Sequence, residues 1–186
     1  VESGADEKSR RLVWVRFEQE DADRKLTVLG TCDVMSSSAE VRNCEGALCY
    51  IDGSGQLRVA LFDRSVDSAT GKLSCVLGRL TFEQFTFERV STMLIDVGRP
   101  AGVGGVRACS DITVDRNGRL VAVNTCDPGK LGPFTSSVSQ VGLLRDGALT
   151  FAWSDRVEVA KCDGLKVESV GFELGPNGAM WIGTDD

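Results

Sequence analysis

Three acidic residues precede three turns that contain glycine, and their spacing along the chain is nearly regular. Glu45 and Glu168 each lie ten residues before a turn glycine, and Asp111 lies seven residues before another. Carboxylates that meet without cationic neighbours favour a hard cation such as Ca²⁺. Glu45, Asp111 and Glu168 are therefore candidate ligand or metal residues, with Ca²⁺ as the candidate cofactor. The alternative is that each acid accepts hydrogen bonds from backbone N–H groups of its own loop.

More polar candidates follow the second strand of each predicted hairpin. Asp127 and Asp185 stand there, and a two-stranded hairpin returns them to the end where the first group of acids lies. Asn124 opens the long irregular segment 124–137, and long loops on a rigid scaffold often carry function. Asn124, Asp127 and Asp185 are therefore added to the ligand or metal candidates. Turn formation and solvation are their alternative roles.

The chain has no histidine, and this excludes several kinds of active site. Ser–His and Cys–His pairs, HExxH zinc sites and imidazole general bases are all ruled out. Catalysis would have to use carboxylates, Lys, Tyr, Cys or a bound metal. Whether the chain is an enzyme stays open, and the catalytic form we consider is a metal-dependent hydrolase.

The seven cysteines contain no CxxC pair, so a zinc site is disfavoured, and their odd number leaves at least one unpaired within the chain. Cys109 and Cys126 flank one predicted hairpin almost symmetrically and are the candidate disulfide. A disulfide there would imply an oxidising compartment, extracellular or periplasmic. The alternative is that the cysteines are small apolar residues of the core.

Length and charge bound the remaining possibilities. The 186 residues fit a single domain, residues 1–186, with residues 1–11 as a polar, flexible N-terminus. The net charge of -6 repels phosphate backbones, so nucleic acid is not an expected partner. No apolar run approaches the roughly 20 residues that span a bilayer. A protein partner, a small ligand or a second copy of the chain remain as candidates.

Short runs of Val, Leu, Phe and Trp, bounded by Gly, Asp, Asn and Pro, predict an all-β fold. No stretch of 12 or more residues has the apolar spacing of an amphipathic helix. The three tryptophans, Trp14, Trp153 and Trp181, lie in predicted strands. We expect them in the core or between neighbouring sheets.

Three segments share one pattern: an acidic approach, a hairpin and an acidic exit. They span 45–63, 110–127 and 168–186, and their turn glycines, Gly55, Gly118 and Gly178, are separated by 63 and 60 residues. Other hairpins lie between them, with turns at Asp146–Gly147, within 20–24 and within 72–90. The pattern predicts four-stranded units that repeat about every 60 residues.

The segments "SDITVDRNGRLVAVNT" and "ESVGFELGPNGAMWIGTDD" resemble the strand–turn–strand units of NHL-type, gluconolactonase-like and phytase-like β-propellers. The resemblance implies radial four-stranded blades. On this interpretation the chain carries the second half of one blade, two full blades and the first half of another. It would be a partial propeller, three blades closed on themselves, or a ring of six completed by a second copy. A β-sandwich or barrel is the alternative architecture.

Fold and residues together favour a noncatalytic binding module that recognises a ligand or protein through loops at one rim. One alternative is a metal-assisted hydrolase of a phosphoester or lactone, in which the cation activates water. Another is a structural segment whose open strand edges pair with another chain.

Overall fold

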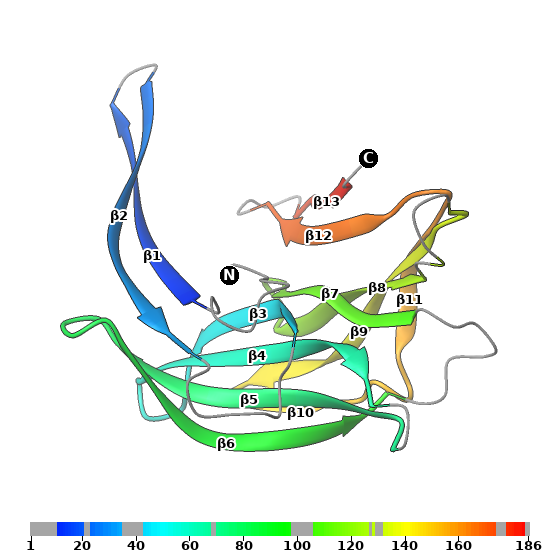
Figure 1. Cartoon of the computed structure of the whole chain (residues 1–186), viewed down its shortest axis with the longest axis horizontal. Coiled ribbons are helices and arrows are strands. Elements are labelled where there is room, and N and C mark those ends of the chain that lie inside the picture. The colour runs from blue at the N-terminus through cyan, green and yellow to red at the C-terminus, as the bar shows by residue number, and fades with distance from the viewer. Residues whose placement is uncertain are drawn as a thin grey trace.

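The structure is a computed structural model of the chain, and it describes residues 11–20, 23–34, 43–67, 70–97, 106–126, 128, 132–173 and 178–184. Within these residues every regular element is a β-strand (Figure 1). The strands are β1 (Arg11–Glu20), β2 (Asp23–Asp33), β3 (Cys44–Ile51), β4 (Leu57–Val66), β5 (Lys72–Thr81), β6 (Thr86–Asp96), β7 (Val106–Val114), β8 (Arg119–Cys126), β9 (Thr135–Arg145), β10 (Ala148–Phe151), β11 (Val157–Asp163), β12 (Val167–Phe172) and β13 (Met180–Thr184). The prediction of an all-β protein is confirmed.

Nine of the strands form one sheet that consists of two antiparallel meanders. In the first meander β3, β4, β5 and β6 pair in sequence order, and in the second β7, β8 and β9 do the same. One bridge, Ser65 opposite Arg107, joins β4 to β7 and makes the two meanders one sheet. Each meander is therefore a unit of four strand positions that begins at a glycine-containing hairpin.

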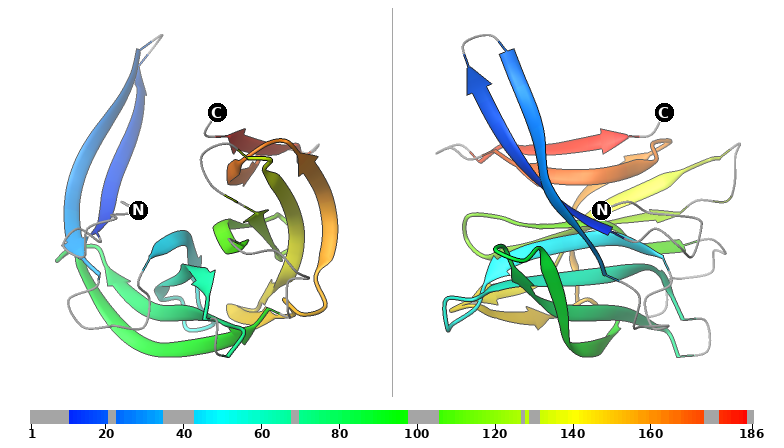
Figure 2. Two further views of the ribbon diagram at one scale, coloured as in Figure 1. Left: turned by 45° about the vertical axis from the view of Figure 1, so that its right-hand side comes forward. Right: turned by 60° about the vertical axis from the view of Figure 1, so that its left-hand side comes forward.

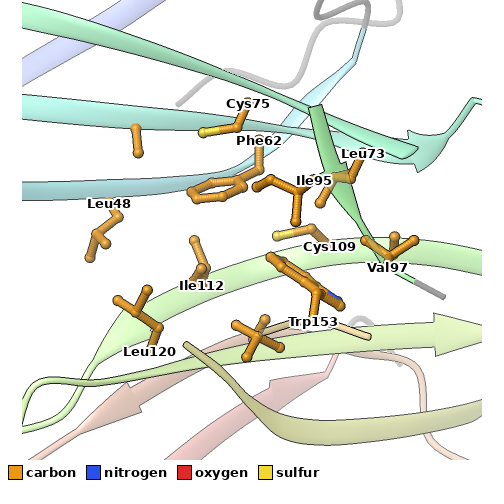
Figure 3. Close-up of a cluster of buried hydrophobic side chains, with 14 residues drawn as sticks. Leu48, Phe62, Leu73, Cys75, Ile95, Val97, Cys109, Ile112, Leu120 and Trp153 are labelled. Atoms are coloured by element: carbon orange, nitrogen blue, oxygen red, sulfur yellow. The ribbon is translucent and has the colours of Figure 1, made fainter. Parts of the chain in front are cut away.

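The fourth position of the second meander is shared by two short strands. β10 pairs with Gly142–Arg145 of β9, and β11 pairs with Thr135–Gln140 along the same strand. Trp153 lies in the break between them and is only 1% exposed. Its ring packs against Phe62 of the first meander at 6.1 Å between centroids. The break therefore places the Trp153 side chain at the junction of the two meanders (Figure 3).

Two further hairpins stand apart from the nine-stranded sheet. β1 pairs only with β2 and β12 only with β13 among the described strands, each as an antiparallel two-stranded sheet. β12 packs on β7 and β8, whereas β1 lies beside the β5–β6 turn, where Trp14 contacts Phe82 and Phe85. In the left view of Figure 2 the strands follow an arc that is open between these two hairpins.

The apolar pattern of the second strands explains why they are central. β4 is buried at every residue from Val59 to Asp63, and β8 at every residue from Leu120 to Val123. Strands that are apolar on both faces suit a position between two sheet neighbours and two covering layers. They form the main core with Leu73 and Cys75 of β5 and with Ile112 of β7 (Figure 3).

The predicted hairpins lie where the sequence placed them, with one exception in detail. Gly55, Gly118 and Gly178 all have positive φ and occupy the turns of β3–β4, β7–β8 and β12–β13. The β9–β10 turn is formed by Asp146 and Gly147, both at positive φ. The β5–β6 turn, which could not be located within 72–90, reverses at Phe85 with φ 48°, and no glycine marks it.

The expected burial of the tryptophans holds for Trp14 and Trp153 but not for Trp181. The Trp181 ring on β13 is 66% exposed. It lies on a strand whose second edge has no partner among the described residues.

A matched pair of leucines tests where the core lies. Leu73 on β5 is fully buried, whereas Leu94 on β6 is 59% exposed. We expect Leu73→Ala to lower the free energy of unfolding by about 2 to 5 kcal/mol, because it removes buried methyl groups and leaves a cavity. Leu94→Ala should change it by less than about 0.5 kcal/mol. Urea denaturation of both variants measures the difference, and equal losses would contradict this description of the core.

Candidate functional site

The three hairpins that carry the acidic candidates share a β-bulge in their first strand. The bulge lies at Glu45 in β3 and at Glu168 in β12, where the register shifts by one residue. In β7 the shift falls between Arg107 and Asp111, so the bulge ends directly before Asp111. Bulges re-aim side chains at the ends of strands. The three predicted acids therefore occupy related positions in three related hairpins.

Glu45 is held by an arginine of the neighbouring strand. Arg64 Nη1 on β4 donates to Glu45 Oε1 at 2.9 Å, and the glutamate side chain is only 12% exposed. The pair clamps the bulged start of β3 to the end of β4. This position serves strand pairing within its own hairpin.

Asp111 joins two neighbouring hairpins through its carboxylate. Oδ1 accepts a hydrogen bond from the Ile112 N–H at 2.8 Å, and Oδ2 accepts one from the Val170 N–H on β12 at 2.9 Å. Burial raises the pKa of Asp111, and the two backbone hydrogen bonds only partly oppose this. The side chain therefore acts as a bridge from β7 to β12 across 59 residues of sequence.

Glu168 pairs with Lys166 two residues earlier, at 2.8 Å between Oε1 and Nζ. Thus Glu45, Asp111 and Glu168 each contact a cation or backbone N–H group. Across the residues that the structure describes, no group of three or more Cys, Asp or Glu side chains is arranged to hold a metal ion. Of the other candidates, Asp127 and Asp185 lie outside the described residues. The three described acids therefore lie in separate pairings rather than in one group.

Asn124 lies at the junction of the two meanders. Its Oδ1 accepts a hydrogen bond from Trp153 Nε1 at 3.4 Å, and its Nδ2 is buried without a hydrogen-bond partner in the described part of the chain. The residue sits opposite the β7 bulge in the register of β7 and β8. Asn124 thus positions the Trp153 ring that joins the meanders.

A buried hydroxyl pair, Thr125 and Ser136, fastens β12 to the second meander, and both residues lie within the segment 124–137. Thr125 Oγ1 donates to the Val167 carbonyl at 2.8 Å, and Ser136 Oγ accepts from the Val167 N–H at 3.0 Å. Both hydroxyls are fully buried, 3.0 Å apart. The threonine after the apolar run of β8 was the available signal on one side, whereas β9 is rich in serine and does not single out Ser136.

Cys109 and Cys126 are not joined by a disulfide in the structure. All seven cysteines are free thiols, and Cys109 is fully buried. Burial raises the pKa of Cys109 well above its ordinary value, with smaller contributions from Asp111 and the neighbouring thiols. The β7 bulge places Cys109 under Gly46, where an added Cβ would lie 2.6 Å from the Cys109 sulfur. The thiol therefore fills the core between β3 and β7.

The turns at the opposite end of the hairpins are locked by two aspartates that the sequence analysis missed. Asp52 Oδ1 accepts from the N–H groups of Ser54 and Gln56, and Asp115 Oδ1 accepts from those of Asn117 and Arg119. In both turns Oδ2 receives an arginine Nε at 2.6 Å. The shared signal is an Asp three residues before the turn glycine with an Arg soon after it.

The hydrogen bonds to these two carboxylates favour their ionised forms. The Ser54 hydroxyl and the Arg58 guanidinium hold the pKa of Asp52 well below its ordinary range. Burial alone would raise the pKa of Asp115, but the bonds from the Arg119 backbone and side chain outweigh it and lower the pKa. In both turns, therefore, each carboxylate oxygen accepts hydrogen bonds from within the hairpin.

A small cleft lies between two of the turns. Its volume is about 170 Å³. It is lined by Asp115, Arg116, Asn117 and Arg119 from the β7–β8 turn and by Phe172, Glu173 and Gly178 from the β12–β13 hairpin. Ligand sites for drug-sized molecules usually occupy about 300 to 1,000 Å³. The cleft is therefore smaller than a site for a drug-sized ligand.

Exposed large apolar side chains occur on the two terminal hairpins, as they also do on β6 and β11. On β1 and β2 the exposed side chains are Val13, Val15, Phe17, Leu26, Val28 and Leu29. On β13 they are Trp181 and Ile182. On β1–β2 the register places Val15 beside Val28 and Phe17 beside Leu26, and contiguous apolar surface of this kind marks interaction sites on folded proteins.

Comparisons of the chain with known protein families, with curated proteins and with solved structures found no match. No helix long and apolar enough to cross a membrane occurs among the described residues.

The Asp115 lock has a defined pH dependence. Because the folded-state pKa of Asp115 is lowered, its stabilising contribution is present above the unfolded-state pKa and is lost as pH falls through the folded-state pKa. We expect Asp115→Asn to lower the free energy of unfolding by roughly 1 kcal/mol at pH 7, and this difference should vanish as the pH falls below about 4. Urea denaturation across pH measures it.

Asp163→Asn is the matched control, because Asp163 also pairs with a cation but its side chain is 66% exposed. It should change the free energy of unfolding by less than about 0.5 kcal/mol at every pH. A loss for Asp115→Asn that does not depend on pH would refute the lock.

The Asp111 bridge predicts a local effect on β12. Asp111→Ala removes the acceptor of the Val170 N–H, so hydrogen exchange at Val170 should accelerate by tenfold or more, since a lost bond to a charged group is worth about 1.5 to 3 kcal/mol. Amides of β5, which Asp111 does not contact, serve as the internal reference. Uniform acceleration throughout the chain would show general unfolding instead of a lost bridge.

Proposed function

We propose that this protein is a noncatalytic interaction module with propeller-type architecture, which works by pairing the open strands of its terminal hairpins with another polypeptide. The observation that carries the proposal is the contrast between β13 and its counterparts β4 and β8. All three are second strands of related hairpins, but only β13 lacks a third strand beside it among the described strands.

The architecture is supported by the repetition of local devices along the chain. Two units of four strand positions follow one another, and each begins with a bulged strand and a turn that an aspartate closes. β12–β13 repeats the bulge. At the base of its turn the Glu173 N–H donates to the Ala179 carbonyl at 2.8 Å, so Glu173 occupies the position that Asp52 and Asp115 occupy in the two shorter turns. The first strands also lie side by side, β3 with β7 and β7 with β12. Blades of a propeller are arranged in this way.

The noncatalytic interpretation is supported by what the candidate residues contact. Glu45, Asp111 and Glu168 hold Arg64, the Val170 N–H and Lys166, respectively, so their oxygens serve the fold. The cleft at the turn end is small, and two of its polar side chains, Asp115 and Arg119, are paired with each other. A hydrolase would need acids that face a cation or a water.

A second mode of binding, through the turns at one rim, is favoured by the cleft itself. It lies between two turns of neighbouring hairpins, and its floor is fixed by the Asp115 lock. Gly118 must be glycine there, because its φ is 76° and an added Cβ would lie 2.3 Å from the Leu144 carbonyl oxygen. Such a rigid notch suits a single side chain of a protein partner.

The tryptophans provide the test, because they separate folding from association. Trp153→Ala should lower the free energy of unfolding by about 3 to 5 kcal/mol, since its ring is 1% exposed. Trp181→Ala should change it by less than about 0.5 kcal/mol, because its ring is 66% exposed. Yet Trp181→Ala should weaken concentration-dependent association, measured by sedimentation of the full chain. If the wild-type chain self-associates, an association that Trp181→Ala leaves unchanged would contradict the proposal, and so would a large loss of stability in that variant.

A further inference from the structure

The strand that belongs beside β13 can be identified from the register of the three hairpins. Leu57, Leu120 and Met180 each lie two residues after the turn glycine and each face the last residue of the preceding strand. Trp181 therefore corresponds to Val121 of β8, and Ile182 corresponds to Ala122. The equivalence makes the three second strands directly comparable.

The comparison shows how much of β13 is left uncovered. Val121 is 3% exposed and Ala122 fully buried, because β9 pairs along β8 and neighbouring layers cover it. Trp181 is 66% exposed and Ile182 is 39% exposed. The segment Met180–Thr184 also contains no charged residue. Natural edge strands usually carry charges or bulges that prevent pairing, so β13 has the composition of a central strand.

β13 has no third and fourth strand beside it among the described strands, and the β1–β2 hairpin of the same chain matches these two positions. In the complete units the third and fourth positions are β5–β6 and β9 with β10 and β11. β1–β2 is an antiparallel hairpin that precedes a complete unit in the chain, as β5–β6 precedes the next one. β1 is apolar on both faces: Leu12 and Trp14 are buried, whereas Val15 and Phe17 are exposed. A strand of this pattern suits a third position, with a neighbour on each side.

Within one copy the two terminal hairpins lie at opposite ends of the arc (Figure 2). Closure within one chain would give three units, whereas propellers typically have about 4 to 8. Two copies give six. A two-fold axis between them would form both junctions at once, and closed two-fold dimers are the commonest protein oligomers.

We propose that β13 of one copy pairs with β1 of a second copy, and that β1 of the first pairs with β13 of the second. The two chains then share two mixed units of four strands, and the exposed apolar faces of both hairpins become buried. The inference rests on the proposed function, and it names the partner as a second copy of this chain. The backbone ladder supplies the pairing, while Trp181, Ile182, Val15 and Phe17 supply apolar contact.

Light scattering of the full chain after gel filtration tests the stoichiometry. The expected mass is twice 19.9 kDa. Ile182→Glu and Val15→Glu should each give monomers, because each places a charge in both junctions of the dimer. Val159→Glu is the matched control: Val159 is 56% exposed on β11, outside the proposed junctions, and the variant should remain dimeric. Circular dichroism confirms that each variant is folded.

Mixing the two monomeric variants tests the head-to-tail arrangement. A heterodimer of Ile182→Glu with Val15→Glu has one junction with both charges and one that is wild type. We expect the mixture to recover dimer, at least tenfold more than either variant alone. A dimer that persists in Val15→Glu but not in Ile182→Glu would show that β13 pairs with a surface other than β1, and this would overturn the proposed pairing.

A monomeric wild-type chain would overturn the second-copy proposal, and hydrogen exchange then separates the two claims. Fast exchange of the β13 amides in that monomer would leave the proposed function standing with a different partner. Slow exchange there would show that the β13 edge is already covered, and the proposed function would fail as well.

Discussion

The second strand of a four-stranded unit must have a partner on each edge and a layer on each face. β4 and β8 meet this requirement, because both contain an unbroken buried apolar run, at 59–62 in β4 and at 120–123 in β8. Backbone hydrogen bonds and buried apolar side chains stabilise the same two strands, so the contributions of strand pairing and of burial to stability cannot be separated there. β13 has the apolar composition of a central strand, but among the described strands it has a partner on only one edge.

The polar residues of the fold fasten units to one another. Asp111 reaches Val170, Thr125 and Ser136 hold Val167, and Asn124 orients Trp153. Each contact joins segments that are distant in sequence, and each satisfies a group that would otherwise be buried without a partner. Because an unpaired buried polar group costs about 1 to 3 kcal/mol, such contacts fix how neighbouring hairpins sit against each other. Of the carboxylates singled out by spacing, Asp111 belongs to this set, whereas Glu45 and Glu168 pair within their own hairpins.

Local patterns were sufficient for the strands and most turns, because a glycine at positive φ and an apolar run act within a few residues. The hairpins at Gly55, Gly118 and Gly178 are examples. The partners of the acids were not accessible in this way. Arg64 lies 19 residues from Glu45, and Val170 lies 59 from Asp111. Spacing revealed that the acids recur, but the same spacing is compatible with a cation site and with structural ties. The turn at Phe85 contains no residue type that predicts a turn there.

Trp181 shows why a correct strand assignment can still misjudge burial. Its run of apolar neighbours predicts a buried strand, and the corresponding Val121 is indeed buried. Burial, however, depends on the strands that lie beside a segment, and these are not encoded in the segment itself. An exposed indole on an open edge is a hazard for a free monomer, since such edges pair indiscriminately. A specific partner strand removes the hazard by covering the edge and the ring together. The proposed pairing with a second copy therefore accounts for an apolar strand whose side chains are exposed in the single chain.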